Sequence, residues 1–158
     1  MKVLIAYDSV SSSKCTAKVA EAIASALKEK GLEVISAPVG DAKHLQVEEY
    51  DCLLIGSPTM GWAPTRHTKE FLDRLKGRRF AGKRAASFDT QIRSIMSGNA
   101  NKAMESKLRG LGYTIARPYL QAYVRSEKKV YHLAEGELEK ASAWARELAE
   151  ALNKPSGT

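Results

Sequence analysis

The sequence has few cysteine and histidine residues, and they are too widely spaced to form a familiar metal site. The 158 residues include two cysteines, Cys15 and Cys52, and three histidines that occur singly. Structural zinc sites use four cysteine or histidine ligands, usually in closely spaced pairs, and the sequence contains no such pair. We therefore expect no metal site. We expect Cys52, which begins an apolar run, to be a small buried residue.

The sequence also lacks a long hydrophobic run. No apolar stretch approaches the roughly 20 residues that a membrane-spanning helix requires. The β-rich run that ends at Asp8 is too short for a secretory signal peptide, and no cleavage pattern follows it. These absences predict a cytoplasmic protein with no membrane partner. A hydrophobic content of 44% over 158 residues is enough for one folded domain. We expect this domain at residues 1–153, followed by a frayed tail at 154–158.

Acidic residues are fewer than basic ones, 18 against 25, so the net charge is +7. The segment from Arg66 to Arg84 contains eight lysines and arginines but only two acids, Glu70 and Asp73. Such a segment can attract nucleic acid, anionic lipid or an acidic protein. At this modest net charge we favour a solvated helix and loop, and we expect no nucleic-acid partner.

The sequence does contain a regular alternation of apolar runs and amphipathic segments. Short, continuously apolar runs predict buried strands at 2–7, 32–38, 52–56, 84–88 and 113–116, the last able to resume at 121–125. Apolar stripes at helical spacing predict helices around 19–27, 68–75, 104–111 and 138–152. The segment 40–50 fits either a short helical turn or irregular chain. The alternation predicts a single α/β domain with a parallel sheet between two layers of helices.

In an open parallel sheet, ligands bind beyond the carboxyl ends of the strands. The loop that follows the first predicted strand reads DSVSSSKCTAKVA and contains five hydroxyl residues and Lys14, but no glycine. It leads into a helix, whose free N–H groups and positive dipole end favour a phosphate dianion. The alternative is a serine-rich loop in which Ser13 or Thr16 is an ordinary helix N-cap.

The second and third loops suggest a site for a flat ring. In GSPTMGWAP, Pro58 and Gly61 favour a non-helical path, and Met60 and Trp62 are large apolar side chains in a loop that should face solvent. An exposed tryptophan there suggests a stacking platform, although Trp62 could instead cover a neighbouring helix. In the third loop, FDTQIRSIMSGNANK, the residues Asp89 to Gln91 could recognise the edge of such a ring, or Asp89 could simply form a turn.

These three stretches resemble the flavodoxin-type, FMN-binding domain family. The matching segments are IAYDSVSSSKCTAKVAEAIASALKEKG, LLIGSPTMGWAPTRHTKEFLDRL and FDTQ followed by SGNANKAMESKLRGLGY, and the resemblance covers essentially the whole chain. It implies a three-layer α/β/α sandwich with a five-stranded parallel sheet in the order 2-1-3-4-5. It further implies that the first loop holds the phosphate of FMN and that the other two flank the isoalloxazine ring.

The resemblance also assigns individual residues. Ser11, Ser13 and Thr16 match the hydroxyl positions of the family's phosphate loop, and Ser12 and Cys15 fill its variable positions. Trp62 is the best candidate for stacking on the flavin, with Met60 as the fallback. The full set of predicted cofactor-binding residues is Ser9, Ser11, Ser12, Ser13, Lys14, Cys15, Thr16, Pro58, Thr59, Met60, Gly61, Trp62, Asp89, Thr90 and Gln91. No catalytic side chain is expected.

Two features depart from the family pattern. Lys14 stands where the family usually has glycine, and the span from Tyr7 to Thr16 is about two residues longer than usual. Glycine allows a positive φ and a close approach of backbone to ligand. The loop therefore either takes another path, with the lysine charge in part compensation, or binds FMN poorly.

The basic net charge is the second departure, because familiar flavodoxins are acidic. It suggests a redox partner with an acidic docking face.

The leading hypothesis is a small flavoprotein that carries electrons between partner proteins, as a monomer or homodimer. The first alternative is an FMN-dependent NAD(P)H:quinone-type reductase. The second is a binding module that keeps the fold, has lost the cofactor and uses the segment Arg66–Arg84. A phosphate loop does not by itself distinguish FMN from another phosphorylated flat cofactor.

Overall fold

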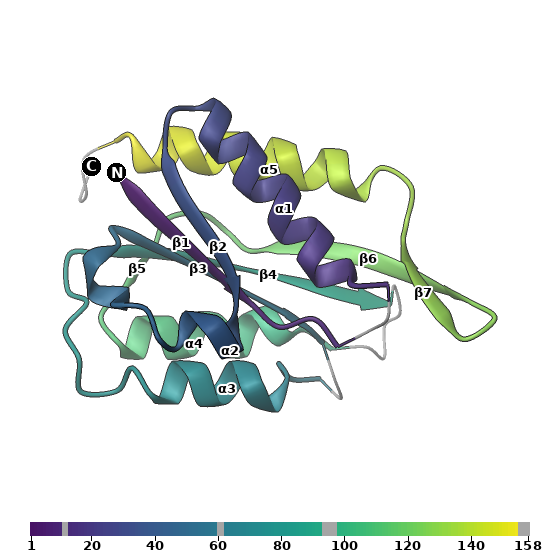
Figure 1. Ribbon diagram of the computed structural model, residues 1–158, viewed down its shortest axis with the longest axis horizontal. Coiled ribbons are helices and arrows are strands. Elements are labelled where there is room, and N and C mark those ends of the chain that lie inside the picture. The colour runs from purple at the N-terminus through teal and green to yellow at the C-terminus, as the bar shows by residue number, and fades with distance from the viewer. Residues whose placement is uncertain (11–12, 60–61, 93–97, 155–158) are drawn as a thin grey trace.

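The computed structural model describes residues 1–10, 13–59, 62–92 and 98–154, and it alternates strands with helices as the sequence predicts (Figure 1). The first half of the chain forms β1 (Lys2–Tyr7), α1 (Cys15–Glu29), β2 (Glu33–Pro38), α2 (Val39–Ala42), a short 3-10 helix (Val47–Glu49), β3 (Cys52–Pro58) and α3 (Arg66–Asp73). The second half forms β4 (Arg84–Ile92), α4 (Ala100–Gly110), β5 (Thr114–Ile115), β6 (Leu120–Glu127), β7 (Val130–Leu133) and α5 (Glu137–Leu152).

The strands form one sheet, in which β2, β1, β3 and β4 lie side by side and parallel. The predicted order 2-1-3-4-5 is confirmed, but the prediction of five strands is wrong because the described residues form a sheet of seven. The fifth position is shared by β5 and β6, which both pair with β4 in parallel. Arg84 pairs with Thr114 and Phe88 with Leu120, so three residues of β4 lie between the two pairs but five residues lie between their partners in the fifth position. Pro118, which has no N–H to donate, lies in this interruption.

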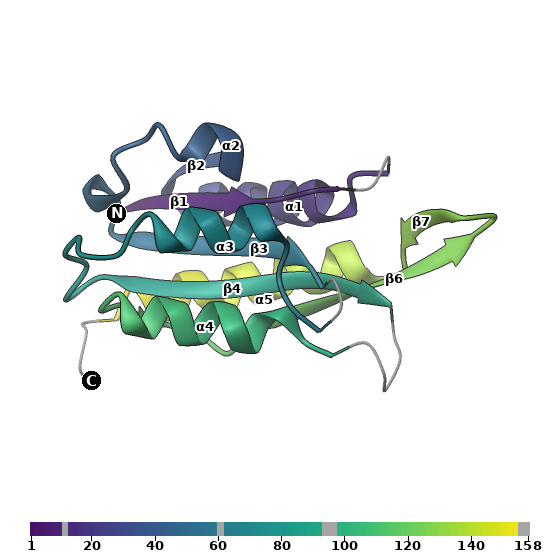
Figure 2. The same cartoon turned by 90° about the horizontal axis from the view of Figure 1, so that it is seen from below.

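Helices cover both faces of the sheet, as expected for a three-layer sandwich. Helices α1 and α5 lie on one face and α2, α3 and α4 on the other (Figures 1 and 2). Alternate strand residues serve the two cores: in β1, Ile5 packs beneath α1 and α5, whereas Leu4 packs with the other layer. Cys52 is fully buried, as predicted, and burial raises the pKa of its thiol to about 12.

Two strands extend further than the sequence predicts. Pro58 ends β3, and the polar residues Asp89, Thr90 and Gln91 belong to β4 rather than to a loop. They are held in the sheet because Asp89 and Thr90 pair with β3 while Gln91 pairs with β6. Pairing of this kind comes from the neighbouring strands, so a polar composition alone does not mark the end of a strand.

The chain also forms a β-hairpin that the sequence analysis did not predict. Strand β7 runs antiparallel to β6, and the pairing of Glu127 with Val130 leaves a two-residue turn at Lys128 and Lys129. Both lysines have positive φ, 50° and 65°. Such tight turns normally contain Asn-Gly or Asp-Gly, so the sequence lacks the usual signal for a hairpin. The hairpin projects beyond the carboxyl ends of the parallel strands (Figures 1 and 2).

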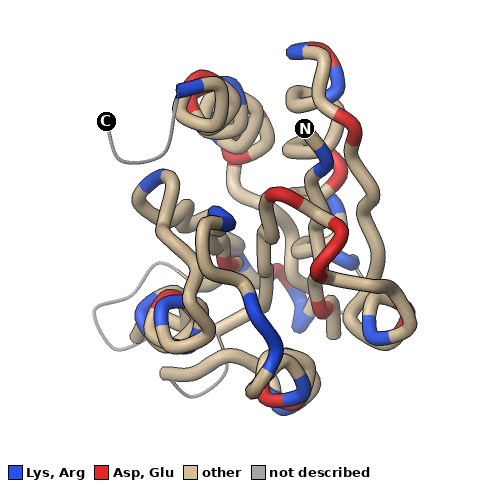
Figure 3. The backbone as a smooth tube through the Cα atoms, turned by 90° about the vertical axis from the view of Figure 1, so that its left-hand side faces the viewer, with Lys and Arg blue, Asp and Glu red and all other residues tan. Residues whose placement is uncertain are grey.

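Much of the basic segment Arg66–Arg84 is engaged within the fold. The Arg84 guanidinium donates to the carbonyl oxygens of Ala151 and Lys154, both at 2.9 Å, and so caps the end of α5. Arg78 pairs with Glu48 across the surface. In Figure 3 acidic and basic segments are interspersed along the backbone. No helix in the described part of the chain has the length and apolar character needed to cross a membrane.

Candidate functional site

The first helix begins with a residue in the left-handed conformation. Lys14 is the N-cap of α1 and has φ 50° and ψ 46°, the region that glycine occupies at little cost. The lysine thus adopts a conformation that favours glycine, and whether the loop takes another path stays a prediction. The neighbouring Ser11 and Ser12 lie outside the described residues.

The N-cap residue of α1 is a lysine, which is not a usual helix cap. The side chain of Lys14 forms no capping hydrogen bond with the described residues, and the first turn contains no acidic residue. The alternative that Ser13 or Thr16 caps the helix is therefore wrong. Thr16 instead forms a buried hydrogen bond of 2.8 Å between its Oγ1 and that of Thr90 in β4. The hydroxyl of Ser9, in the same loop, is buried and has no hydrogen-bond partner among the described residues.

A chain of hydrogen bonds joins the end of β3 to β4 and α4. The backbone N–H of Thr59 donates to the carbonyl of Thr90 at 3.0 Å. The Thr59 hydroxyl accepts from the N–H of Ala100 at 3.0 Å and donates to Asp89 Oδ2 at 2.6 Å. The side-chain amide of Gln91 donates to the same carboxylate oxygen at 2.6 Å. The residue that follows β3 is thus tied to β4 and to the start of α4 at the carboxyl edge of the sheet.

Asp89 is fully buried, and its environment changes its acidity. Burial raises its pKa to about 6, although hydrogen bonds from Thr59 and Gln91 favour the ionised form and limit the rise. Its other oxygen, Oδ1, is buried and has no hydrogen-bond partner among the described residues. The turn-forming alternative for Asp89 is wrong, because the residue is paired within β4.

Trp62 is presented to solvent by the second loop. Its side chain is 58% exposed, its φ is 76°, and it forms a parallel bridge with Gly98. A Cβ atom at position 98 would lie 2.6 Å from the Trp62 ring atom Cε3, so only glycine fits beneath this tryptophan. The alternative that Trp62 covers a helix does not hold. Met60 and Gly61 lie outside the described residues.

A second network, which the sequence analysis missed, fixes the far end of this loop. Thr65 is the N-cap of α3, and its hydroxyl donates to Asp8 Oδ2 at 2.6 Å. The N–H of Thr65 donates to Ser57 Oγ at 3.0 Å. The preference of threonine for helix N-caps was the one signal available in the sequence.

A pocket of about 340 Å³ lies at the carboxyl edge, between α1, β3, β4 and the β6–β7 hairpin. Six of the predicted site residues line it, namely Cys15, Thr16, Pro58, Thr59, Thr90 and Gln91. Lys129 and Tyr131 of the hairpin also line it and were not predicted. The remaining described candidates, Ser9, Ser13, Lys14, Trp62 and Asp89, are not among its lining residues. The pocket combines a helix start, hydroxyl and amide groups, and apolar side chains.

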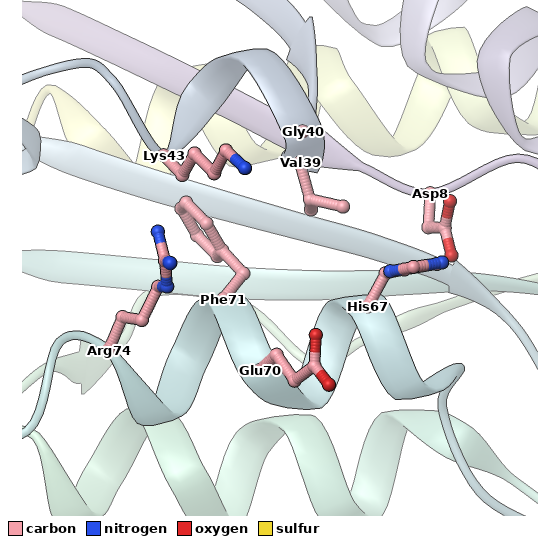
Figure 4. Close-up of a pocket in the computed structure, with 8 residues that line it drawn as sticks. All are labelled: Asp8, Val39, Gly40, Lys43, His67, Glu70, Phe71 and Arg74. Atoms are coloured by element: carbon pink, nitrogen blue, oxygen red, sulfur yellow. The ribbon is translucent and has the colours of Figure 1, made fainter.

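A second hollow of about 270 Å³ lies between α2 and α3 (Figure 4). Lys43 and Arg74 stand on either side of the Phe71 ring at one end, and Asp8 and His67 lie at the other. None of the predicted cofactor-binding residues lines it, so it is a weaker candidate for a cofactor site than the pocket at the carboxyl edge. Among the described residues, no group of three or more His, Cys, Asp or Glu side chains could hold a metal ion.

Comparisons with solved structures identify similar folds. Flavodoxin 2 from Bacillus cereus is 27% identical, with a TM-score of 0.79 over 95% of this chain and 99% of that one. A flavodoxin from the domain Archaea is 24% identical, with a TM-score of 0.79 over 98% of this chain and 100% of the other. The rubredoxin oxygen:oxidoreductase of Desulfovibrio gigas is 24% identical, with a TM-score of 0.74; the match covers 97% of this chain but 37% of that protein. No family model and no curated protein matches the sequence.

The similar flavodoxins span this chain and their own lengths almost completely, and the expected strand order is present. The chain therefore has a flavodoxin-like fold.

Proposed function

We propose that the protein is a small FMN-binding flavoprotein that transfers electrons between redox partners. The observation that carries this proposal is the pocket at the carboxyl edge, where Thr16 at the start of α1 meets Thr59 and Thr90 at the ends of β3 and β4. A parallel sheet binds its ligand at this edge. The flavodoxins of similar structure support FMN as the ligand.

The described residues fit this cofactor. The free N–H groups at the start of α1, with Ser13, Thr16 and the charge of Lys14, would hold the phosphate. The exposed ring of Trp62 would stack on the isoalloxazine, and Gln91 and Thr59 would face the ribityl chain and the ring edge from the pocket wall. The bound cofactor would supply the redox chemistry. The role of the protein is then to bind it, orient it and shield it from water.

The partner we propose has an acidic docking face. The net charge of this protein is +7, and a partner with an acidic docking face would be attracted to it. Its oligomeric state, monomer or homodimer, and its cytoplasmic location stay predictions from the sequence.

The two alternatives have less support. No contact among the described residues favours a nicotinamide-dependent reductase over a carrier. A binding module that uses the segment Arg66–Arg84 is weakened by the internal contacts of that segment, because Arg78 and Arg84 are committed to Glu48 and to the end of α5. Of its eight basic side chains, Lys69, Arg74 and Arg79 have no ion pair or side-chain hydrogen bond in the described structure.

The experiment that tests the proposal is a visible absorption spectrum of the purified protein, followed by fluorescence titration of the stripped protein with FMN and riboflavin. We expect a yellow protein that binds FMN far more tightly than riboflavin, because the two ligands differ only in the phosphate. Turnover of NAD(P)H by the isolated protein would indicate the reductase instead. A colourless protein that leaves FMN fluorescence unchanged would overturn both redox functions.

A further inference from the structure

The β6–β7 hairpin brings a basic side chain to the pocket, next to the start of α1. The Cys15 thiol donates to the carbonyl oxygen of Tyr131 at 3.7 Å, which places β7 directly beside the first residue of the helix. Lys129, at the hairpin turn, lines the same pocket as Cys15 and Thr16. Residues more than 100 positions apart in sequence therefore meet at one hollow.

We propose that Lys129 is a second cationic ligand of the cofactor phosphate, so that the hairpin and the start of α1 grip the same group from two sides. This inference rests on the proposed function and deepens it, because it assigns a phosphate-binding residue outside the loop between β1 and α1.

The charges around the pocket favour a dianionic ligand. None of the ion pairs within the described residues involves Lys14 or Lys129, and the first turn of α1 contains no acid. A phosphate monoester carries a charge of about −1.5 to −2 at pH 7 and has three acceptor oxygens. It can accept hydrogen bonds from helix N–H groups and from a lysine ammonium at the same time.

The hairpin turn distinguishes its two lysines. Lys128 and Lys129 share the left-handed conformation, but only Lys129 lines the pocket. A substitution at either position therefore replaces a lysine that has a left-handed backbone, and it removes one positive charge. Lys128→Met is thus a matched control for Lys129→Met, and a methionine retains most of the length of the lysine side chain.

The experiment compares the wild-type protein with these two variants by fluorescence titration of the stripped proteins with FMN and with riboflavin. We expect Lys129→Met to weaken FMN binding about tenfold, as the loss of one charge-assisted hydrogen bond implies. Riboflavin binding should change by less than about twofold, because that ligand has no phosphate to lose a contact. Lys128→Met should weaken FMN binding by less than about threefold, through the long-range field alone.

Three results would overturn the role of Lys129. The first is an FMN affinity that is unchanged in Lys129→Met. The second is an equal loss of affinity for FMN and riboflavin in that variant, which would indicate a packing effect. The third is an equal loss of FMN affinity in Lys128→Met, which would indicate an effect of net charge. Thermal melting of each ligand-free variant separates a binding effect from unfolding. If the wild-type protein binds no FMN, or binds riboflavin equally well, the proposed function fails together with this inference, and the wild-type titration alone reports it.

Discussion

At the start of α1 a lysine holds a backbone conformation that glycine adopts more cheaply. Lys14 has φ 50°, and a side chain in the left-handed region costs about 1–2 kcal/mol. Its sequence position matches the glycine of the resembled phosphate loop, so the sequence predicts a changed path or weak binding. The structure places Lys14 in the left-handed region that favours glycine, which the sequence alone could not predict because a residue type constrains φ without determining it.

We predict that Lys14→Gly raises the free energy of unfolding by about 1 kcal/mol, because the backbone strain is released. The greater conformational entropy that glycine gives the unfolded chain offsets only part of this gain. Lys14→Ala is the control, since alanine removes the charge but keeps the Cβ atom that causes the strain. Urea denaturation of both ligand-free variants measures the difference. Equal stabilities of the glycine and alanine variants would contradict the strain at this site.

Asp89 makes stability depend on pH in an unusual direction. Burial raises its pKa to about 6 from an ordinary value of 3.8, so the folded protein binds this proton more tightly than the unfolded chain does. The contribution of Asp89 to the free energy of unfolding therefore falls as pH rises from about 4 to about 6, and it stays low above that.

We predict that Asp89→Asn raises the free energy of unfolding at pH 7.5 by about 2 kcal/mol and has little effect at pH 4. The asparagine oxygen can still accept from Thr59 and Gln91, because both donors bond to a single carboxylate oxygen. Asp73→Asn is a control of opposite sign: the Lys107 ammonium lowers the pKa of Asp73, so its replacement should destabilise the protein at neutral pH. Urea denaturation at a series of pH values measures both. A gain for Asp89→Asn that is constant with pH would exclude the titration of Asp89 as its cause.

At the scale of elements, the turn before α4 supports Trp62, the residue that we propose stacks on the flavin. A Cβ atom at Gly98 would meet both the ring and the backbone of Trp62 at less than 3.0 Å, and Gly98 also has a φ of +71°. The position of Trp62 therefore depends on a glycine at position 98. The contact between Trp62 and Gly98 could not be predicted from the sequence, because it joins positions far apart in the chain.

We predict that Gly98→Ala destabilises the protein by about 2–3 kcal/mol and weakens FMN binding, because the Trp62 platform must move. Gly31→Ala is the matched control: Gly31 has a φ of +85°, but nothing lies within 4 Å of a Cβ there, so only the backbone penalty of about 1 kcal/mol applies. Denaturation and flavin titration of both variants test this. An FMN affinity that is unchanged in Gly98→Ala would show that Trp62 does not support the ring.

Across the whole molecule, the parts that follow local patterns could be predicted from the sequence. The alternation of apolar runs and helical stripes predicted a parallel sheet between two layers of helices, because each element buries its own apolar residues. The strand order came instead from the resemblance to the flavodoxin-type family. The resumption of the last strand after an interruption was predicted, and β5 and β6 confirm it. The extension of β4 through Asp89–Gln91 was not predicted, because it depends on pairing with other strands. Lys129 was missed for the same reason, since only the folded hairpin brings it to α1.

The net charge of +7 is also a property of the whole molecule, and it should govern association with small redox partners. We predict that the FMN-loaded, reduced protein is oxidised by ferricyanide, an anion, at a rate that falls as ionic strength rises from about 0.01 to about 0.3 M, because salt screens the attraction. Hexaamminecobalt(III), a cation, is the control, and its rate should rise over the same range. Stopped-flow absorbance under anaerobic conditions measures both rates. If the two salt dependences were reversed, the carboxyl edge would present a negative potential despite the net charge, and a partner with an acidic docking face would be excluded.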